Sequence, residues 1–177
     1  MALTAGLAKD CNPNSGGIQR IALANVADIT AISLDSGTSS FIDTITMSGS
    51  ATFFEFEAEQ DSAEWRENGE LVNGSLKYTQ EIEMFLRKQN ASTRAALAEL
   101  GENLCGMVAA VKTTNGQTFI VGWSPNLDLE RPLKLTTDAS TSGKELTDLS
   151  GGTITLAAMS DVKAFTTDVD VFGTLLP

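Results

Sequence analysis

The chain contains no histidine and only two cysteines among its 177 residues. Without histidine, the commonest general base and metal ligand of proteins is missing, which excludes serine–histidine and cysteine–histidine catalysis. Cys11 and Cys105 do not have the C-x-x-C spacing of zinc ribbons and redox motifs. We therefore expect two unpaired thiols, with Cys105 buried beside Leu104 and Cys11 accessible, and we predict neither a metal site nor a cofactor.

Long apolar runs are also missing. No apolar stretch reaches the length of about 18 residues that a membrane-spanning helix needs, so we expect no membrane span. The first 17 residues, MALTAGLAKDCNPNSGG, contain no basic region followed by a long apolar stretch. We accordingly expect no signal peptide. A chain of this length is predicted to fold as one domain with its own core.

Positive charge is scarce. The net charge is −11, and residues 21–65 contain eight carboxylates but no lysine or arginine. A basic surface for gripping nucleic acid is therefore not expected. Two interpretations remain: a solvated surface that keeps the protein in solution, or a surface that must not adhere to a polyanion.

Candidate catalytic groups reduce to carboxylates. Glu55, Glu57 and Glu59 share one face of a predicted strand and are conceivable as a glycosidase pair, but a solvated face is the simpler interpretation. We therefore predict that the chain is not an enzyme. Trp65 and Trp123 are either a sugar-stacking platform or fillers of core gaps.

The most informative segment runs from residue 73 to residue 122. Residues 73–86 alternate between apolar and polar side chains, which predicts a half-buried strand. Residues 91–100 switch to helical spacing, with Leu97, Leu100 and Leu104 on one side and Gly101 as a stop. Residues 107–112 and 118–122 flank Asn115-Gly116, which predicts a β-hairpin.

Other segments are mostly β. Strands are predicted at 17–24, 52–59, 127–135, 153–158 and 161–172, with Phe54 and Phe56 facing inward and Glu55 and Glu57 outward. Residues 26–34 are either a strand or an irregular segment, and 60–69 and 136–149 are expected to be polar connections. The predicted fold is mainly β (α+β): an antiparallel sandwich or barrel with one flanking helix. Residues 1–17 are expected to form an arm, and 35–52 a long loop or extended hairpin.

Three stretches of the sequence are similar to bacteriophage tail tube proteins, also called major tail proteins. They are VAAVKTTNGQTFIVG, in which an NG turn precedes a strand ending in Gly122; LTDLSGGTITLAA, in which Asp148 to Gly151 lead into a strand; and the early GGIQRIALA. The resemblance is best over residues 73–158. It implies a β-sandwich or barrel whose copies form rings, hexameric in that family, that stack into a hollow tube through which DNA passes.

This resemblance also implies candidate residues. The expected acidic lumen residues are Asp28, Asp35, Asp43, Glu55, Glu57 and Glu59. The expected assembly residues, in the arm and in segment 35–52, are Leu3, Leu7, Asp35, Phe41, Ile42, Ile45 and Met47. The expected partners are further copies, other tail proteins and DNA that passes without tight binding, within a virion tail. The alternative is a carbohydrate- or receptor-binding β module on a virion surface.

Overall fold

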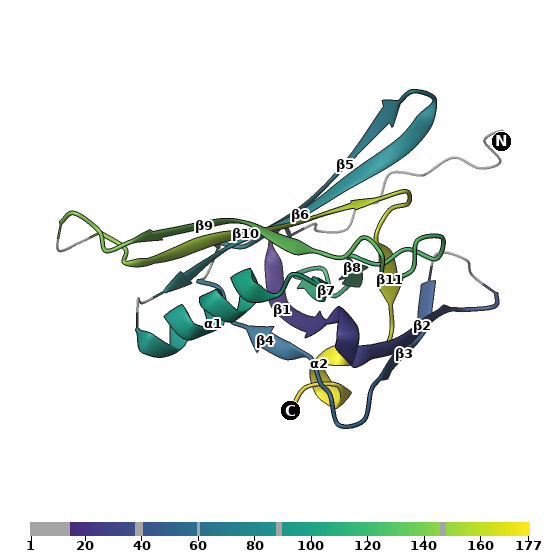
Figure 1. The fold of residues 1–177 in the computed structure, drawn as a ribbon, viewed down its shortest axis with the longest axis horizontal. Helices are drawn as coiled ribbons and strands as arrows, with labels where there is room; N and C mark the ends of the chain where they lie inside the picture. The colour runs from purple at the N-terminus through teal and green to yellow at the C-terminus, as the bar shows by residue number, and fades with distance from the viewer. Residues whose placement is uncertain (1–14, 38–40, 60, 88–89, 146–147) are drawn as a thin grey trace.

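Two β-sheets make up most of the structure. The computed structural model describes residues 15–37, 41–59, 61–87, 90–145 and 148–177. A curled sheet of seven strands has the order β2-β3-β11-β8-β7-β1-β4, and a sheet of four strands has the order β5-β6-β10-β9 (Figure 1). The fold is therefore mainly β, as predicted.

The bounds of the elements follow the chain in one series. The strands are β1 (Ile18–Asn25), β2 (Ile29–Leu34), β3 (Phe41–Met47), β4 (Phe54–Phe56), β5 (Glu64–Val72), β6 (Ser75–Arg87), β7 (Met107–Thr113), β8 (Thr118–Val121), β9 (Lys134–Thr141), β10 (Gly151–Ser160) and β11 (Phe165–Thr167). The helices are η1 (Val26–Asp28), a 3₁₀ turn, and the α-helices α1 (Ala91–Glu102) and α2 (Val171–Thr174).

Both faces of the central strands β1 and β7 of the seven-stranded sheet are buried. Residues that alternate along β1 and β7 point to opposite faces, because successive side chains of a strand do so. Ile21 and Leu23 pack with Val111 against the four-stranded sheet and α1. Ala22 and Val108 pack on the other face, where the curl of the sheet and the C-terminal segment enclose a second core. This double burial explains why all residues from Met107 to Val111 are buried.

Strand β6 confirms the alternation predicted for residues 73–86. Ile82, Met84 and Leu86 are buried, and the residues between them are half-buried. The outer end of this strand differs from the prediction, because Leu76 is 49% exposed beyond the reach of the second sheet. Asn73 and Gly74 are not part of the strand. They form the turn between β5 and β6, and both have a positive φ, of 50° and 82°, as a type I′ turn requires.

Helix α1 confirms the predicted helix over residues 91–100. Its first turn is capped by Asn90, whose side chain accepts a hydrogen bond from Thr93 N, as is typical of an N-cap. Leu97 and Leu100 are buried in the core shared by the two sheets. The helix continues to Glu102, past the predicted stop at Gly101. The prediction for Leu104 is wrong, because its side chain lies beyond the helix and is 80% exposed.

The β7–β8 hairpin has the predicted NG turn. Of the two turn residues only Gly116 has a positive φ, of 82°, so the turn is not the type I′ form. Gly122 at the end of β8 has a φ of 88°. A Cβ atom there would lie 3.0 Å from Leu133 N, so this position requires glycine on two grounds.

Several expected connections are strands. Segment 60–69 contains most of β5, and segment 136–149 contains most of β9. The strand predicted at 127–135 is wrong, because only Lys134 and Leu135 of that segment belong to a strand. Segment 35–52 contains β3, which pairs antiparallel with β2 and parallel with β11. Phe53, rather than Phe54, faces inward: Phe53 is fully buried and Phe54 is 53% exposed. The prediction for Phe54 is therefore wrong, whereas Phe56 on the same strand face packs against the core as predicted.

Candidate interaction surfaces

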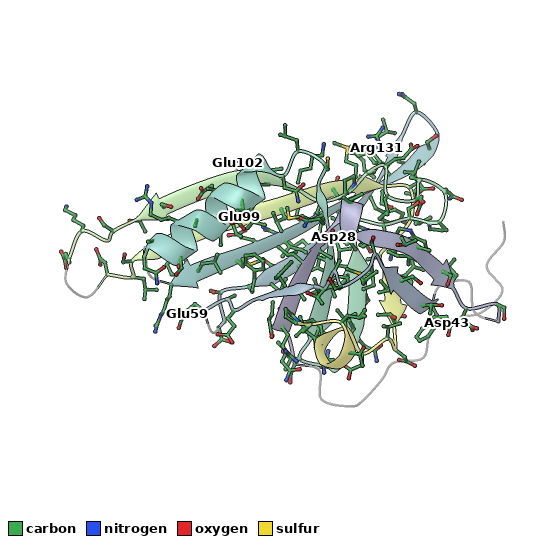
Figure 2. The ribbon with its side chains drawn as sticks, turned by 60° about the horizontal axis from the view of Figure 1, so that its bottom comes forward. Asp28, Asp43, Glu59, Glu99, Glu102 and Arg131 are labelled. Carbon is green, nitrogen blue, oxygen red and sulfur yellow. The ribbon has the colours of Figure 1, made fainter. Side chains whose placement is uncertain are left out.

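The six acidic residues proposed for a lumen do not gather on one surface. Figure 2 places Glu59 and Asp43 far apart, with Asp28 between them. Glu55, Glu57 and Glu59 do lie together, on β4 and the residues after it. Two of these are neutralised: Glu55 forms an ion pair with Arg20, and Glu59 forms one with Arg87.

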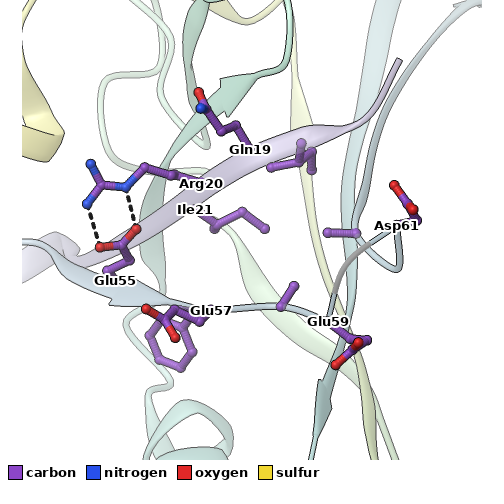
Figure 3. Close-up of a pocket in the computed structure, with 11 residues that line it drawn as sticks. Gln19, Arg20, Ile21, Glu55, Glu57, Glu59 and Asp61 are labelled. Carbon is purple, nitrogen blue, oxygen red and sulfur yellow. Dashed lines mark hydrogen bonds and ion pairs between the residues drawn. The ribbon is translucent and has the colours of Figure 1, made fainter. Parts of the chain in front are cut away.

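The ion pair of Glu55 is bidentate. Arg20 Nε and Nη2 donate to the two carboxylate oxygens of Glu55 at 2.5 and 2.6 Å (Figure 3). These hydrogen bonds hold the pKa of Glu55 below its ordinary value, although burial acts in the opposite direction. The guanidinium also lies 4.7 Å from the ring centre of Phe172. Arg20 therefore links β1, β4 and α2, and Glu55 has a structural role that its sequence position does not reveal.

A cleft opens where β1 and β4 diverge. Pairing between the two strands ends at Ile21 and Phe56, and beyond this point the cleft is lined by Gln19, Glu57, Glu59 and Asp61 (Figure 3). Among the described residues, no group of three or more cysteine, aspartate and glutamate side chains is arranged to hold a metal ion.

An acidic groove runs between β4 and α1. We use this name for the groove lined by the apolar side chains of Phe54, Phe56 and Ala96 and by the carboxylates of Glu55, Glu57, Glu59 and Glu99. Arg87 is the one cation that lines it. Phe54 also lines the adjoining hollow toward Leu100 and Met107. Its exposed ring therefore lies in a concave surface and is flanked by negative charge.

The residues predicted for assembly lie in different environments. Ile42 and Ile45 are buried in a core of this chain, which removes both side chains from the free surface that the prediction requires. Phe41, Met47 and Asp35 are half-buried. Leu3 and Leu7 lie outside the described residues, as do Cys11 and most of the predicted arm. Cys105 is exposed, so the prediction of a buried thiol is wrong.

An apolar surface that the sequence did not reveal lies at the outer end of the β5–β6 hairpin. This end projects from the rest of the structure (Figure 1). Leu71 is 72%, Val72 38% and Leu76 49% exposed there, and Met159 on the neighbouring β10 is 51% exposed. Leu76 and Met159 line one shallow hollow together with Lys77 and Arg131. Met159 and Arg131 also line the adjoining hollow with Lys134.

We call the apolar end of this hairpin, with Met159 and three cations, the arm surface; it is distinct from the arm predicted for residues 1–17. It wraps around the sheet: Leu71 pairs with Leu76 on one face, and Met159 pairs with Thr79 on the other. It comprises Leu71, Val72, Leu76, Met159, Lys77, Arg131 and Lys134. The one sign of this surface in the sequence is that Leu71 and Val72 directly precede the turn of Asn73 and Gly74. Residues beside a solvent-exposed hairpin turn are usually polar.

Both tryptophans pack inward. Trp65 lies against the core, with its ring centre 4.6 Å from that of Phe119. Trp123 is 4% exposed, and its Nε1 donates to Asp128. Both tryptophans therefore fill gaps in the core and do not form an exposed platform for stacking sugars.

Polar networks join the sheets around these surfaces. The fully buried Gln80 of β6 accepts a hydrogen bond from Gly122 N and donates one to Glu67. Asp161, after β10, accepts hydrogen bonds from Ser124 Oγ at 2.6 Å and Asn126 Nδ2 at 2.5 Å. Burial acts to raise the pKa of Asp161, but the hydrogen bonds outweigh it and lower the pKa below its ordinary value.

Comparisons with protein-family models, with curated proteins and with solved structures found no match for this chain. Within the part of the chain that the structure describes, no helix is long and apolar enough to cross a membrane.

Proposed function

We propose that this chain is a structural subunit that assembles with copies of itself into stacked rings, which form the tube of a phage tail and conduct DNA. The observation that carries the proposal is the arm surface. A projecting hairpin with three exposed apolar side chains at its end lowers its free energy when a partner covers it. The sequence resemblance to tail tube proteins indicates that the partner is another copy.

Open sheet edges support the same proposal. Among the described strands, β2 and β4 at the ends of one sheet and β5 and β9 at the ends of the other each pair with one neighbour only. Unpaired edges favour association between chains, because each leaves backbone donors and acceptors available. A subunit of an assembly is expected to have such edges.

The charge supports a conduit. A chain with a net charge of −11 repels a polyanion, so DNA would move along its surface without adhering. Purified protein is expected to cause no mobility shift of DNA, even at low salt. Tight, salt-sensitive binding of DNA would contradict the conduit.

Electron microscopy tests the assembly directly. The purified protein is expected to form rings or short tubes, either alone or when tail-tip components are supplied. Higher ionic strength should favour the particles, because it screens the repulsion between negatively charged copies. A protein that stays monomeric at high concentration and high salt, and also with tail-tip components present, would refute the proposal.

The receptor-binding alternative receives less support from the structure. Carbohydrate platforms use exposed aromatic rings, and both Trp65 and Trp123 pack inward. Phe54 is the one large aromatic side chain that is exposed among the described residues, and its flanking carboxylates are better suited to a cationic partner.

A further inference from the structure

The arm surface and the acidic groove differ in charge. Three cations and two carboxylates line the two hollows of the arm surface. Four carboxylates and one cation line the acidic groove. Lys77 is paired with Glu70, and Glu55 and Glu59 of the groove are paired with Arg20 and Arg87. In a chain of net charge −11, the arm surface is therefore close to neutral, and the groove retains an excess of negative charge.

Each of the two surfaces has charged side chains that form no ion pair within the described part of the chain. Glu57 and Glu99 of the groove form no ion pair with any described residue, whereas Glu55 and Glu59 do. On the arm surface, Arg131 and Lys134 are exposed and likewise form no ion pair within the described part of the chain. Each surface thus retains two charges that a partner of opposite sign would neutralise.

The apolar parts of the two surfaces also match. Seven large hydrophobic side chains are exposed among the described residues, and five of them lie in these two places: Leu71, Val72, Leu76 and Met159 on the arm surface, and Phe54 in the groove. The arm surface is formed by a projecting hairpin and the strand beside it, and the groove is concave. The shapes are therefore those of an insert and a recess.

We infer that the arm surface of one copy docks in the acidic groove of a second copy, an inference that rests on the proposed function. In this contact, Leu76 and its apolar neighbours cover Phe54. Arg131 and Lys134 face Glu57 and Glu99. Burial of the apolar side chains supplies the favourable free energy, and the charges fix the register and exclude the other pairings.

The contact is heterologous, because the two surfaces are different parts of the same chain. Figure 2 places Arg131 on the opposite side of the molecule from Glu59, so one copy presents both surfaces at once. Repetition of such a contact gives a closed ring or an open column, depending on the rotation between copies.

Charge reversal tests the contact. The groove variant is Glu57→Lys with Glu99→Lys, and the arm variant is Arg131→Glu with Lys134→Glu. The side chains of all four residues are exposed, and none of them belongs to a core. Both variants should therefore melt as the wild type does. Each variant alone is expected to associate at least about tenfold more weakly than the wild type, because like charges then face each other.

Mixing the two variants distinguishes this contact from any other. In an equimolar mixture the intact arm surface meets an intact groove, and the reversed arm surface meets a reversed groove of opposite charge. Sedimentation should therefore show association restored in the mixture, with the two variants alternating, where neither variant associates alone. A chain with all four reversals should again form the particles of the wild type. The matched control for the groove variant is Glu145→Lys with Asp168→Lys, which changes the net charge by the same amount and sign at two exposed positions outside both surfaces.

A charge-independent variant completes the test. Leu71→Ser with Leu76→Ser leaves the net charge unchanged and should also weaken association. Wild-type rings or tubes that neither reversal affects would overturn this contact and leave the tube proposal standing, as would single-variant defects that mixing does not complement. A wild-type chain that never associates would overturn both.

Discussion

The packing of α1 gives the sharpest test of the fold. Leu97 is 5% exposed and lies in the core between the two sheets. Truncation of such a leucine to alanine removes buried apolar surface and leaves a cavity, at a cost of about 2–5 kcal/mol. For a domain of this size, each kcal/mol lowers Tm by about 2–4 °C, so Leu97→Ala should lower Tm by about 4–20 °C.

The chain supplies a matched control. Leu104 lies just past the same helix and is 80% exposed, so Leu104→Ala should change the free energy of unfolding by less than about 0.5 kcal/mol. Urea unfolding, followed by tryptophan fluorescence and by circular dichroism, measures both variants. Coincident transitions show that α1 unfolds together with the sheets. Equal stabilities of the two variants would refute the assignment of the buried helix face.

Three further predictions concern single positions. Cys105 should react with a thiol reagent without denaturant, because it is exposed. A Cys105 peptide that mass spectrometry shows to be unlabelled under these conditions would contradict the structure. Gly122→Ala should destabilise the protein by about 1 kcal/mol or more in urea unfolding, because alanine must adopt a positive φ there; an unchanged midpoint would contradict this. The lowered pKa of Asp161 stabilises the fold above the unfolded-state pKa of about 3.9, and this contribution disappears as the pH falls through the folded-state pKa. Asp161→Asn should therefore flatten the loss of stability in acid, and an equally steep loss would count against the lowered pKa.

Local periodicity predicted the elements that have one buried face. The alternation along β6 and the helical spacing of Leu97 and Leu100 follow from the contact of those faces with the core, so the pattern is visible in the sequence. Strands β5 and β9 were missed for the opposite reason. All their residues are exposed or half-buried, so the two strands show no apolar period. Backbone pairing with β6 and β10 defines them.

The candidate surfaces were harder to predict than the fold. The alternation of Phe54 and Phe56 does not show which ring the core reaches: Phe56 packs against the first core, Phe54 is exposed, and Phe53 before the strand is buried in the second core. The sequence of β6 continues to alternate through Leu76, although the core ends before this residue. Exposure at the arm surface therefore depends on where the second layer ends, which no local pattern records. The Ser-, Thr- and Gly-rich composition of residues 35–52 predicts a long loop or an extended hairpin, and it does not show that tertiary packing buries Ile42 and Ile45.

The position of β11 has a consequence for the order in which the chain folds. β11 lies between β8 and β3, and Thr167 Oγ1 donates to the carbonyl oxygen of Ile42, 125 residues earlier in the chain. The β2–β3 hairpin therefore joins its sheet only when nearly the whole polypeptide has been synthesised. Contacts of such long sequence separation form slowly. Until β11 has been made, the edge of β3 that pairs with it stays open, so the seven-stranded sheet cannot be completed before the C-terminal part of the chain is available.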